Sequence, residues 1–170
     1  YMKKLFYIFT ILLLKINFAY SLIEVDITRG NLDPLPIAVS PLHVDPQSDN
    51  YKDIKVKELG DKISSVIEEN FRSTGLFNPL NKDAFVQKAD IAHLKPRFED
   101  WRLITAQALM TGKLLVKDEK LKVEFRLWDL AASQEMIALA FTTTPKNWRR
   151  VAHIISDKIY ERLTGETGYF

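Results

Sequence analysis

The sequence predicts an α/β (α+β) fold in which two long helices pack on one face of a mixed sheet of four to five strands. Two stretches, about 54–73 and 148–163, predict the helices because their apolar residues recur at spacings of three and four. Three later stretches, 108–116, 121–127 and 136–143, alternate apolar residues with others and predict an antiparallel meander. With 170 residues, 46% of them apolar, the chain can supply the core of one domain.

The first 21 residues have the pattern of a secretory signal peptide. Met2-Lys3-Lys4 is basic, Leu5 to Ile16 is almost wholly apolar, and Ala19-Tyr20-Ser21 places small residues where a signal peptidase cleaves. The apolar run is too short to cross a bilayer core of about 30 Å as a helix. We therefore expect residues 1–21 to be removed and the remainder to work in the periplasm, with a permanent membrane anchor as the open alternative.

Charge and cysteine content narrow the function further. The net charge is +2, and loss of Lys3, Lys4 and Lys15 with the signal leaves −1, so the basic balance is no argument for nucleic acid. The sequence contains no cysteine, which excludes disulfides, thiolate metal ligands and a lipid anchor at the cleavage point. Stability must therefore come from packing.

The segment after the signal, residues 22–29, alternates Ile23, Val25 and Ile27 with polar residues. This pattern predicts a strand that either pairs with a sheet or hangs free. Further on, residues 37–39 predict a short apolar strand that ends at Pro41.

The first long helix is expected at about 54–73, with Asp53 as its cap and Gly75 as a left-handed end. Gly60 lies within it and costs about 1 kcal/mol relative to alanine, for which a close packing contact is one explanation. The predicted buried face consists of Val56, Leu59, Ile63, Val66, Ile67 and Phe71.

Four short elements are expected before the meander. Residues 76–80 predict a return strand, 83–88 one helical turn, 91–94 a brief strand, and 96–106 a helix with Asp100 as a cap.

The meander begins with a hairpin whose turn we expect at residues 117–120. The last helix is expected to follow Thr144-Pro145, since proline suits a first helical turn, and to end at Gly165. Its predicted buried stripe consists of Trp148, Val151, Ala152, Ile155, Ile159 and Leu163.

No arrangement in the sequence predicts a catalytic, cofactor-binding or metal site. His43, His93 and His153 are far apart and share no ligand spacing, and the common motifs of zinc, thiol, serine-hydrolase and P-loop chemistry do not occur. Glu124 and Asp129 accompany basic residues on one strand, which favours a solvated charged face over a pair of catalytic carboxylates.

Two aromatic–basic pairs, Trp148 with Arg149-Arg150 and Trp101 with Arg102, resemble base-stacking platforms. Trp148 fits the buried stripe, however, and the exported part is nearly neutral. We therefore expect no nucleic-acid partner.

Several long strings resemble the amino-terminal domain of the TolB family. They are PRFEDWRLITAQALMTGKL (96–114), KVEFRLWDL (122–130) and TTPKNWRRVAHIISDKIYERLTGETGYF (143–170), together with DITRGNLDPLPIAV (26–39) and FRSTGLFNPL (71–80). The resemblance covers essentially the whole chain in family order. It implies an α/β unit similar to an anticodon-binding domain, in the periplasmic Tol–Pal system.

The resemblance also implies a division of the chain. Residues 22–34 correspond to an interaction segment, 35–165 to the α/β domain, and 166–170 to a linker toward the six-bladed β-propeller of the family, which is absent here. In the family that propeller binds the lipoprotein Pal and captures colicins, so no residue of this chain inherits those roles. In the family, the mature amino terminus engages the periplasmic end of TolA or docks back onto TolB itself, and residues 22 to about 33 match that segment here.

These expectations define a non-enzymatic interaction module with no cofactor and no stable membrane insertion after cleavage. A TolA-like periplasmic domain is the expected partner, and Pal is not. Two alternatives stay open, namely an exported ligand-binding domain or enzyme of unknown substrate, and a truncated fragment without full TolB function. The expected partner-binding residues are Leu22, Ile23, Glu24, Val25, Asp26, Ile27, Thr28 and Arg29.

Overall fold

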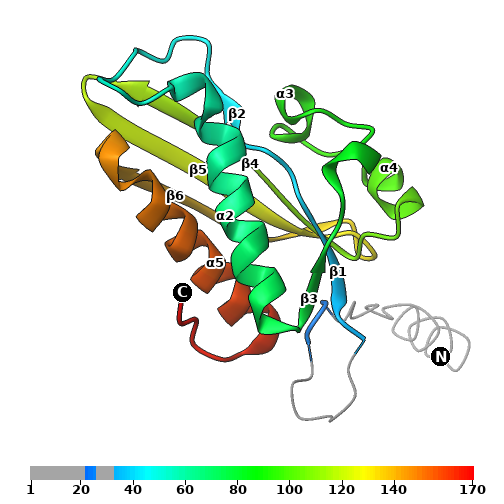
Figure 1. The fold of residues 1–170 in the computed structure, drawn as a ribbon. Coiled ribbons are helices and arrows are strands. Elements are labelled where there is room, and N and C mark those ends of the chain that lie inside the picture. The colour runs from blue at the N-terminus through cyan, green and yellow to red at the C-terminus, as the bar shows by residue number, and fades with distance from the viewer. Residues whose placement is uncertain (1–21, 26–32) are drawn as a thin grey trace, which may run out of the picture.

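The computed structural model describes residues 22–25 and 33–170. The expected signal peptide and residues 26–32 lie outside the described residues. Figure 1 shows a twisted sheet with two long helices lying side by side on one face, as the sequence predicts. Two short helices lie toward the other side. No helix in the described part of the chain has the length and hydropathy needed to span a membrane.

The sheet is mixed, in the strand order β3-β1-β4-β5-β6, with β2 paired to β4. β1 is parallel to both β3 and β4, whereas β4, β5 and β6 form the antiparallel meander that the sequence predicts. Asp118 and Glu119 form the hairpin turn with φ of 48° and 59°, the left-handed conformations that a two-residue hairpin requires. The strands are β1 (Leu35–Val39), β2 (His43–Val44), β3 (Phe77–Pro79), β4 (Ala108–Lys117), β5 (Lys120–Asp129) and β6 (Gln134–Thr143).

The two long helices are α2 (Leu59–Thr74) and α5 (Trp148–Thr164). Both end at the predicted glycines, Gly75 at φ 70° and Gly165 at φ 76°. The expected cap Asp53 is wrong, because the 3-10 turn η1 (Val56–Glu58) leads into α2 and its N-cap position is Glu58, without a side-chain cap hydrogen bond.

The region between β3 and β4 differs most from the expectation. Residues 91–94 do not form a strand, because Ala89–Ala92 is the one-turn helix α3. Ile91 and Leu94 are three residues apart, as on one helical face, but both are exposed, so burial gives no alternation to distinguish helix from strand. A 3-10 turn η2 (Lys82–Ala84) replaces the helical turn expected at 83–88.

The expected helix at 96–106 is the shorter α4 (Phe98–Leu103). Asp100 is not its cap, because it lies inside the helix and forms an ion pair with Arg97, whose Nη2 is 2.6 Å from Oδ2 of Asp100. Before α5, Pro145 starts the 3-10 turn η3 (Pro145–Asn147), which agrees with the preference of proline for a first turn.

The alternation along the strands builds a separate apolar cluster on each face of the sheet. The larger cluster lies under α2 and α5 and contains the buried stripes predicted for both helices; partly buried Trp148 packs against its margin. The smaller cluster lies under α3 and α4 and consists of Ala38, Ala92, Trp101, Ala106, Leu109, Trp128 and Leu130. Neighbours such as Met110 and Leu109 face opposite clusters because successive strand residues point to opposite faces.

Gly60 is confirmed as a close contact. A side chain at this position would collide with the backbone oxygen of Leu42, whose N–H donates to the carbonyl of Gly60 at 3.3 Å. The absence of a Cβ therefore lets α2 pack directly against the chain between β1 and β2.

Candidate functional site

The amino-terminal segment Leu22–Val25 lies against the body of the domain, near the end of α5 (Figure 1). It has no strand partner, so the expected strand is not formed over these four residues. The N–H of Val25 donates to the carbonyl of Leu163 at 2.6 Å, and the N–H of Ile23 donates to Oδ2 of Asp129 at 2.9 Å. The rest of the expected partner-binding stretch, Asp26 to Arg29, lies outside the described residues.

Asp129 is the anchor of this contact. It ends β5 and is 1% exposed, so the expectation of a solvated carboxylate is wrong for this residue. Its second oxygen, Oδ1, accepts the N–H of Ala132 at 2.9 Å in the turn to β6. Buried carboxylates require such partners, and here one of the two partners belongs to the terminal segment.

The side chains of the segment alternate as the sequence suggests. Ile23 and Val25 are partly buried and pack on the larger cluster, whereas Glu24 is exposed. Glu24 borders an open groove of about 490 Å³ between β6 and α5. Ile137 and Leu139 line its apolar side, and Lys158, Glu161, Arg162 and Gly165 line its polar side. This groove is continuous with the docked segment.

The open part of the other sheet face carries charge, as expected for Glu124. Lys122 Nζ is 2.7 Å from Glu124 Oε1 and Lys113 Nζ is 3.5 Å from Oε2. The hydrogen bond from Lys122 is the main reason why the pKa of Glu124 lies below its usual value. Arg126 pairs with Glu135 at 3.0 Å. These exposed ion pairs form a solvated face and contribute little to the stability of the fold.

Two of the three histidines meet in space, which sequence spacing did not predict. The rings of His43 and His93 stack with centroids 4.3 Å apart and planes inclined by 4°. His153 instead contacts Asn70, with 3.0 Å between its Nδ1 and the amide nitrogen. Across residues 22–25 and 33–170, no group of three His, Asp or Glu side chains is placed to hold a metal ion.

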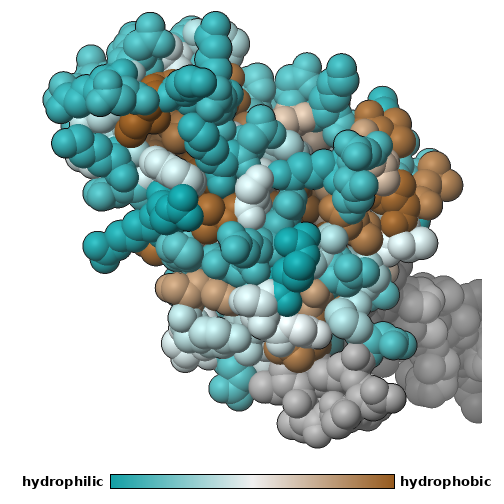
Figure 2. Space-filling view, in the orientation of Figure 1, coloured by the Kyte–Doolittle hydropathy of each residue, from teal (hydrophilic) through white to brown (hydrophobic). Residues whose placement is uncertain are grey.

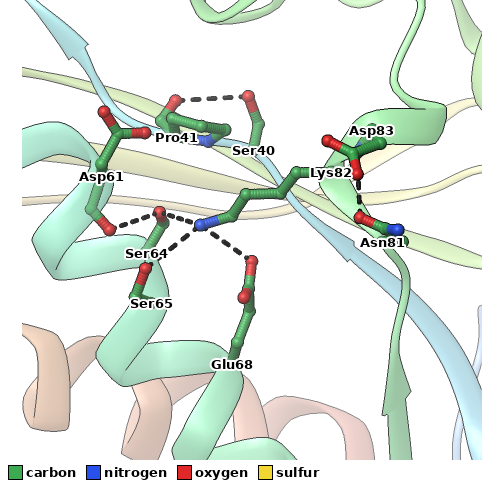
Figure 3. Close-up of polar contacts among 9 residues, drawn as sticks. All are labelled: Ser40, Pro41, Asp61, Ser64, Ser65, Glu68, Asn81, Lys82 and Asp83. Carbon is green, nitrogen blue, oxygen red and sulfur yellow. Dashed lines mark hydrogen bonds and ion pairs between the residues drawn. The ribbon is translucent and has the colours of Figure 1, made fainter.

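A polar cluster between α2 and η2 has the composition of a serine–lysine pair. Figure 3 shows Lys82 reaching from η2 to α2, where its Nζ lies 3.0 Å from Ser64 Oγ and 3.1 Å from Glu68 Oε1. Ser64 is fully buried, and its hydroxyl donates to the carbonyl of Asp61 at 3.0 Å. A nucleophile must reach a substrate, and Ser64 is buried. The contacts of Lys82 tie η2 to α2.

The tryptophans of the two aromatic–basic pairs both pack against the body of the domain. Trp101 is 1% exposed, and its indole N–H donates to Gln87 Oε1 at 2.8 Å. Trp148 packs at the margin of the larger cluster, with the guanidinium of Arg149 4.8 Å from its ring centre. Neither tryptophan offers the exposed face that base stacking needs.

The described residues thus define an α/β domain with two long helices on one face of a mixed sheet and a docked amino-terminal segment. Comparison with known proteins gives the particular family. The model of the TolB amino-terminal domain matches residues 23–136, and the chain belongs to the TolB family, whose members are periplasmic proteins not known as enzymes.

The relatives agree with this assignment. The Tol–Pal system protein TolB of Pelagibacter ubique (strain HTCC1062) is 64% identical over 171 residues, which cover 99% of this chain and 38% of that protein. TolB of Acinetobacter baumannii has a TM-score of 0.63 at 20% identity, covering 80% of this chain and 30% of that one. A hypothetical protein of Chlamydia trachomatis shares the fold at a TM-score of 0.53 and 12% identity, covering 79% of this chain and all of that one.

Proposed function

We propose that this chain is a non-enzymatic periplasmic interaction domain of the Tol–Pal system, which supports outer-membrane integrity and envelope constriction at cell division. The docked segment Leu22–Val25 is the observation that carries the proposal, because it joins the body through contacts that another protein could replace. The family assignment supplies the system. Since the chain spans 38% of its curated relative, roles of the whole protein are part of this proposal.

The partner we propose is a TolA-like periplasmic domain that binds the stretch of Leu22 to Arg29 by strand addition. An extended segment offers its backbone N–H and C=O groups to a sheet edge, and alternate side chains to pockets. In the docked state the N–H groups of Ile23 and Val25 are used by Asp129 and by the carbonyl of Leu163. The same donors would serve the edge of a partner strand once the segment leaves the body.

The energetics favour such an exchange. A hydrogen bond typically contributes a net 0.5–1.5 kcal/mol, roughly doubled when one partner is charged. The segment adds only partial burial of Ile23 and Val25. Docking of this size leaves a minor undocked population, and the apparent affinity for the partner scales with that population.

Deletion of residues 22–33 provides the first test. We expect the shortened protein to keep its circular dichroism spectrum and to lose binding to the periplasmic domain of TolA in calorimetric titration. Unchanged affinity would refute the proposed role of the segment. A melted spectrum would show that the segment is instead an integral part of the fold.

Asp129→Asn gives a finer test without shortening the chain. Loss of the charge weakens the bond to the N–H of Ile23, so we expect a two- to tenfold tighter apparent affinity for the partner. Asp157→Asn is the matched control, because Asp157 Oδ1 likewise accepts a backbone N–H, but from Phe170 at 2.9 Å and not from the docked segment. Equal effects of the two variants, or weaker binding by Asp129→Asn, would contradict docking as a competitor of the partner.

We propose no Pal-binding site within residues 22–170, because the family resemblance assigns that role to the propeller. Specific retention of Pal by this chain in a pull-down with purified proteins would overturn that expectation.

A further inference from the structure

The stacked histidines join the α3–α4 region to the sheet. His43 lies on β2, which pairs with β4, and His93 follows the last residue of α3. Both rings are half-buried. A 4.3 Å separation with nearly parallel planes is face-to-face contact between two titratable side chains from elements 50 residues apart.

Hydrogen bonds orient the ring of His93 and hold the end of α3. Its Nδ1 lies 2.8 Å from the carbonyl oxygen of Ala89, which can only accept, so Nδ1 carries the proton. The carbonyl of His93 accepts a bond from Arg126 Nη1 at 3.4 Å, which ties the end of α3 to β5.

Charged groups from each packed element surround the pair. Asp90 comes from α3, Asp45 follows β2, Lys113 comes from β4, and Arg126 from β5. The two carboxylates favour a charged His43, whereas Lys113 disfavours it. Burial followed by the charge of His93 outweighs the carboxylates and holds the pKa of His43 below its ordinary value.

We propose that the His43–His93 stack is a pH-sensitive latch that holds α3 on the sheet near neutral pH and loosens it as acidity rises. The stack can carry one positive charge on either ring. Two positive charges at this distance would repel each other strongly in a half-buried site. α3 has a single turn, Ile91 within it and Leu94 after it are exposed, and Ala92 is its buried residue, so one small side chain opposes its release.

The direction of the effect follows from linkage. Release of α3 removes His93 and exposes more of His43, so the pKa of His43 rises toward its ordinary value of 6.5, whereas in the latched state its pKa is lower. Between these two values the released state binds more protons. The latch is therefore complete above pH 6.5 and weakens as the pH falls through that value, which is the range in which histidine acts as a switch.

Amide hydrogen exchange followed by NMR tests the latch. The reporters are the N–H groups of Ala92 and His93, which bond to the carbonyls of Lys88 and Ala89 at 3.0 and 3.3 Å. We expect their protection factors, corrected for the intrinsic pH dependence of exchange, to fall about tenfold between pH 7.5 and 5.0. Protection in α2 should stay constant. Constant protection in α3 would overturn the proposal.

His93→Phe is the decisive variant, since it keeps a flat ring against His43 and removes one charge. We expect a higher pKa for His43 in its ring-proton titration and loss of the pH dependence of α3. His153→Gln is the control and should leave both readouts as in the parent chain. A pH-dependent α3 in His93→Phe, or an unmoved His43 pKa, would show that the stack is packing alone.

Discussion

The two faces of the sheet carry apolar clusters of very different size. Under α2 and α5 the apolar cluster is large, and fully buried side chains such as Phe71 and Phe125 are at most 1% exposed; a polar link from Asn70 to Ser156 at 2.9 Å also joins the two helices. Under α3 and α4 the cluster is smaller and depends on polar links, including Trp101 to Gln87 and Trp128 to Thr111.

Figure 2 shows the surface consequence of this difference. Brown apolar side chains gather over the α3–α4 side of the molecule, and the exposed apolar residues of that region are Val86, Ile91, Leu94 and Leu103. Apolar area left in water does not stabilise the fold. The sheet therefore supports a firm layer, formed by α2 and α5, on one face and a lightly held layer, formed by α3 and α4, on the other. We expect local opening first in the lightly held layer.

The largest expected effect concerns the firm layer. Phe71→Ala removes a fully buried ring that also contacts Phe77, with centroids 5.1 Å apart. We expect a loss of about 3–5 kcal/mol in the free energy of unfolding, measured by urea titration with tryptophan fluorescence. Arg72→Ala, an exposed neighbour, should stay within about 0.5 kcal/mol. A cost below about 1 kcal/mol for Phe71→Ala would contradict the dominance of this layer.

This contrast also explains what could be predicted from sequence. The stripes of α2 and α5 and the alternation of β5 were predictable because each element is long and has one strongly apolar face. Residues 91–94 were mispredicted because α3 is one turn, with Ile91 and Leu94 exposed. Local pattern carries no information about such a weakly packed element.

The candidate site was predictable only in part. The alternation of Ile23 and Val25 identified the side chains that face the body. The anchor Asp129 was missed, because a carboxylate after a charged strand looks solvated until tertiary structure brings Ile23 to it. The meeting of His43 and His93 was equally invisible, since it depends on how α3 lies over β2.

The next largest effect separates the two layers. Gln87→Leu leaves the indole N–H of Trp101 and the N–H of Arg97 without their acceptor, which lies 2.8 Å from each. A buried unpaired donor costs about 1–3 kcal/mol; this applies to the buried indole N–H of Trp101 and less to the partly buried N–H of Arg97. We expect hydrogen exchange to accelerate in residues 85–106 while α2 and α5 keep their protection. Gln107→Leu is an exposed control and should leave the exchange rates of both layers unchanged. An equal loss of protection in both layers for Gln87→Leu would show that they open as one unit.

A backbone contact in the firm layer gives an intermediate effect. Gly60→Ala would gain about 1 kcal/mol in helix propensity. The added Cβ, however, collides with the carbonyl oxygen of Leu42, which belongs to the backbone and cannot rotate away. We expect a net loss of about 1–3 kcal/mol in urea titration. Glu69→Ala, on the exposed side of α2, is the control, and a more stable Gly60→Ala would show that this contact is looser than described.

The smallest effect concerns the polar tie between α2 and η2. Burial raises the pKa of Glu68 above its ordinary value, and the ion pair with Lys82 at 3.1 Å offsets this in part. A raised folded-state pKa means that the folded protein binds the proton more tightly. The contribution to stability is therefore full below the unfolded pKa near 4.5 and is lost as the pH rises through the folded pKa.

Glu68→Gln should consequently change stability by less than about 1 kcal/mol at pH 7, because it removes both the buried charge and its ion pair. Lys82→Met should cost more, since it leaves the carboxylate without its cation. Unfolding free energies at pH 4 and pH 7 provide the check, with exposed Glu69→Gln as the control for the general effect of charge. We expect the unfolding free energy of the parent chain, relative to that of Glu68→Gln, to be higher at pH 4 than at pH 7. The opposite sign would mean that the attraction of Lys82 outweighs burial, and that this tie strengthens the firm layer at neutral pH.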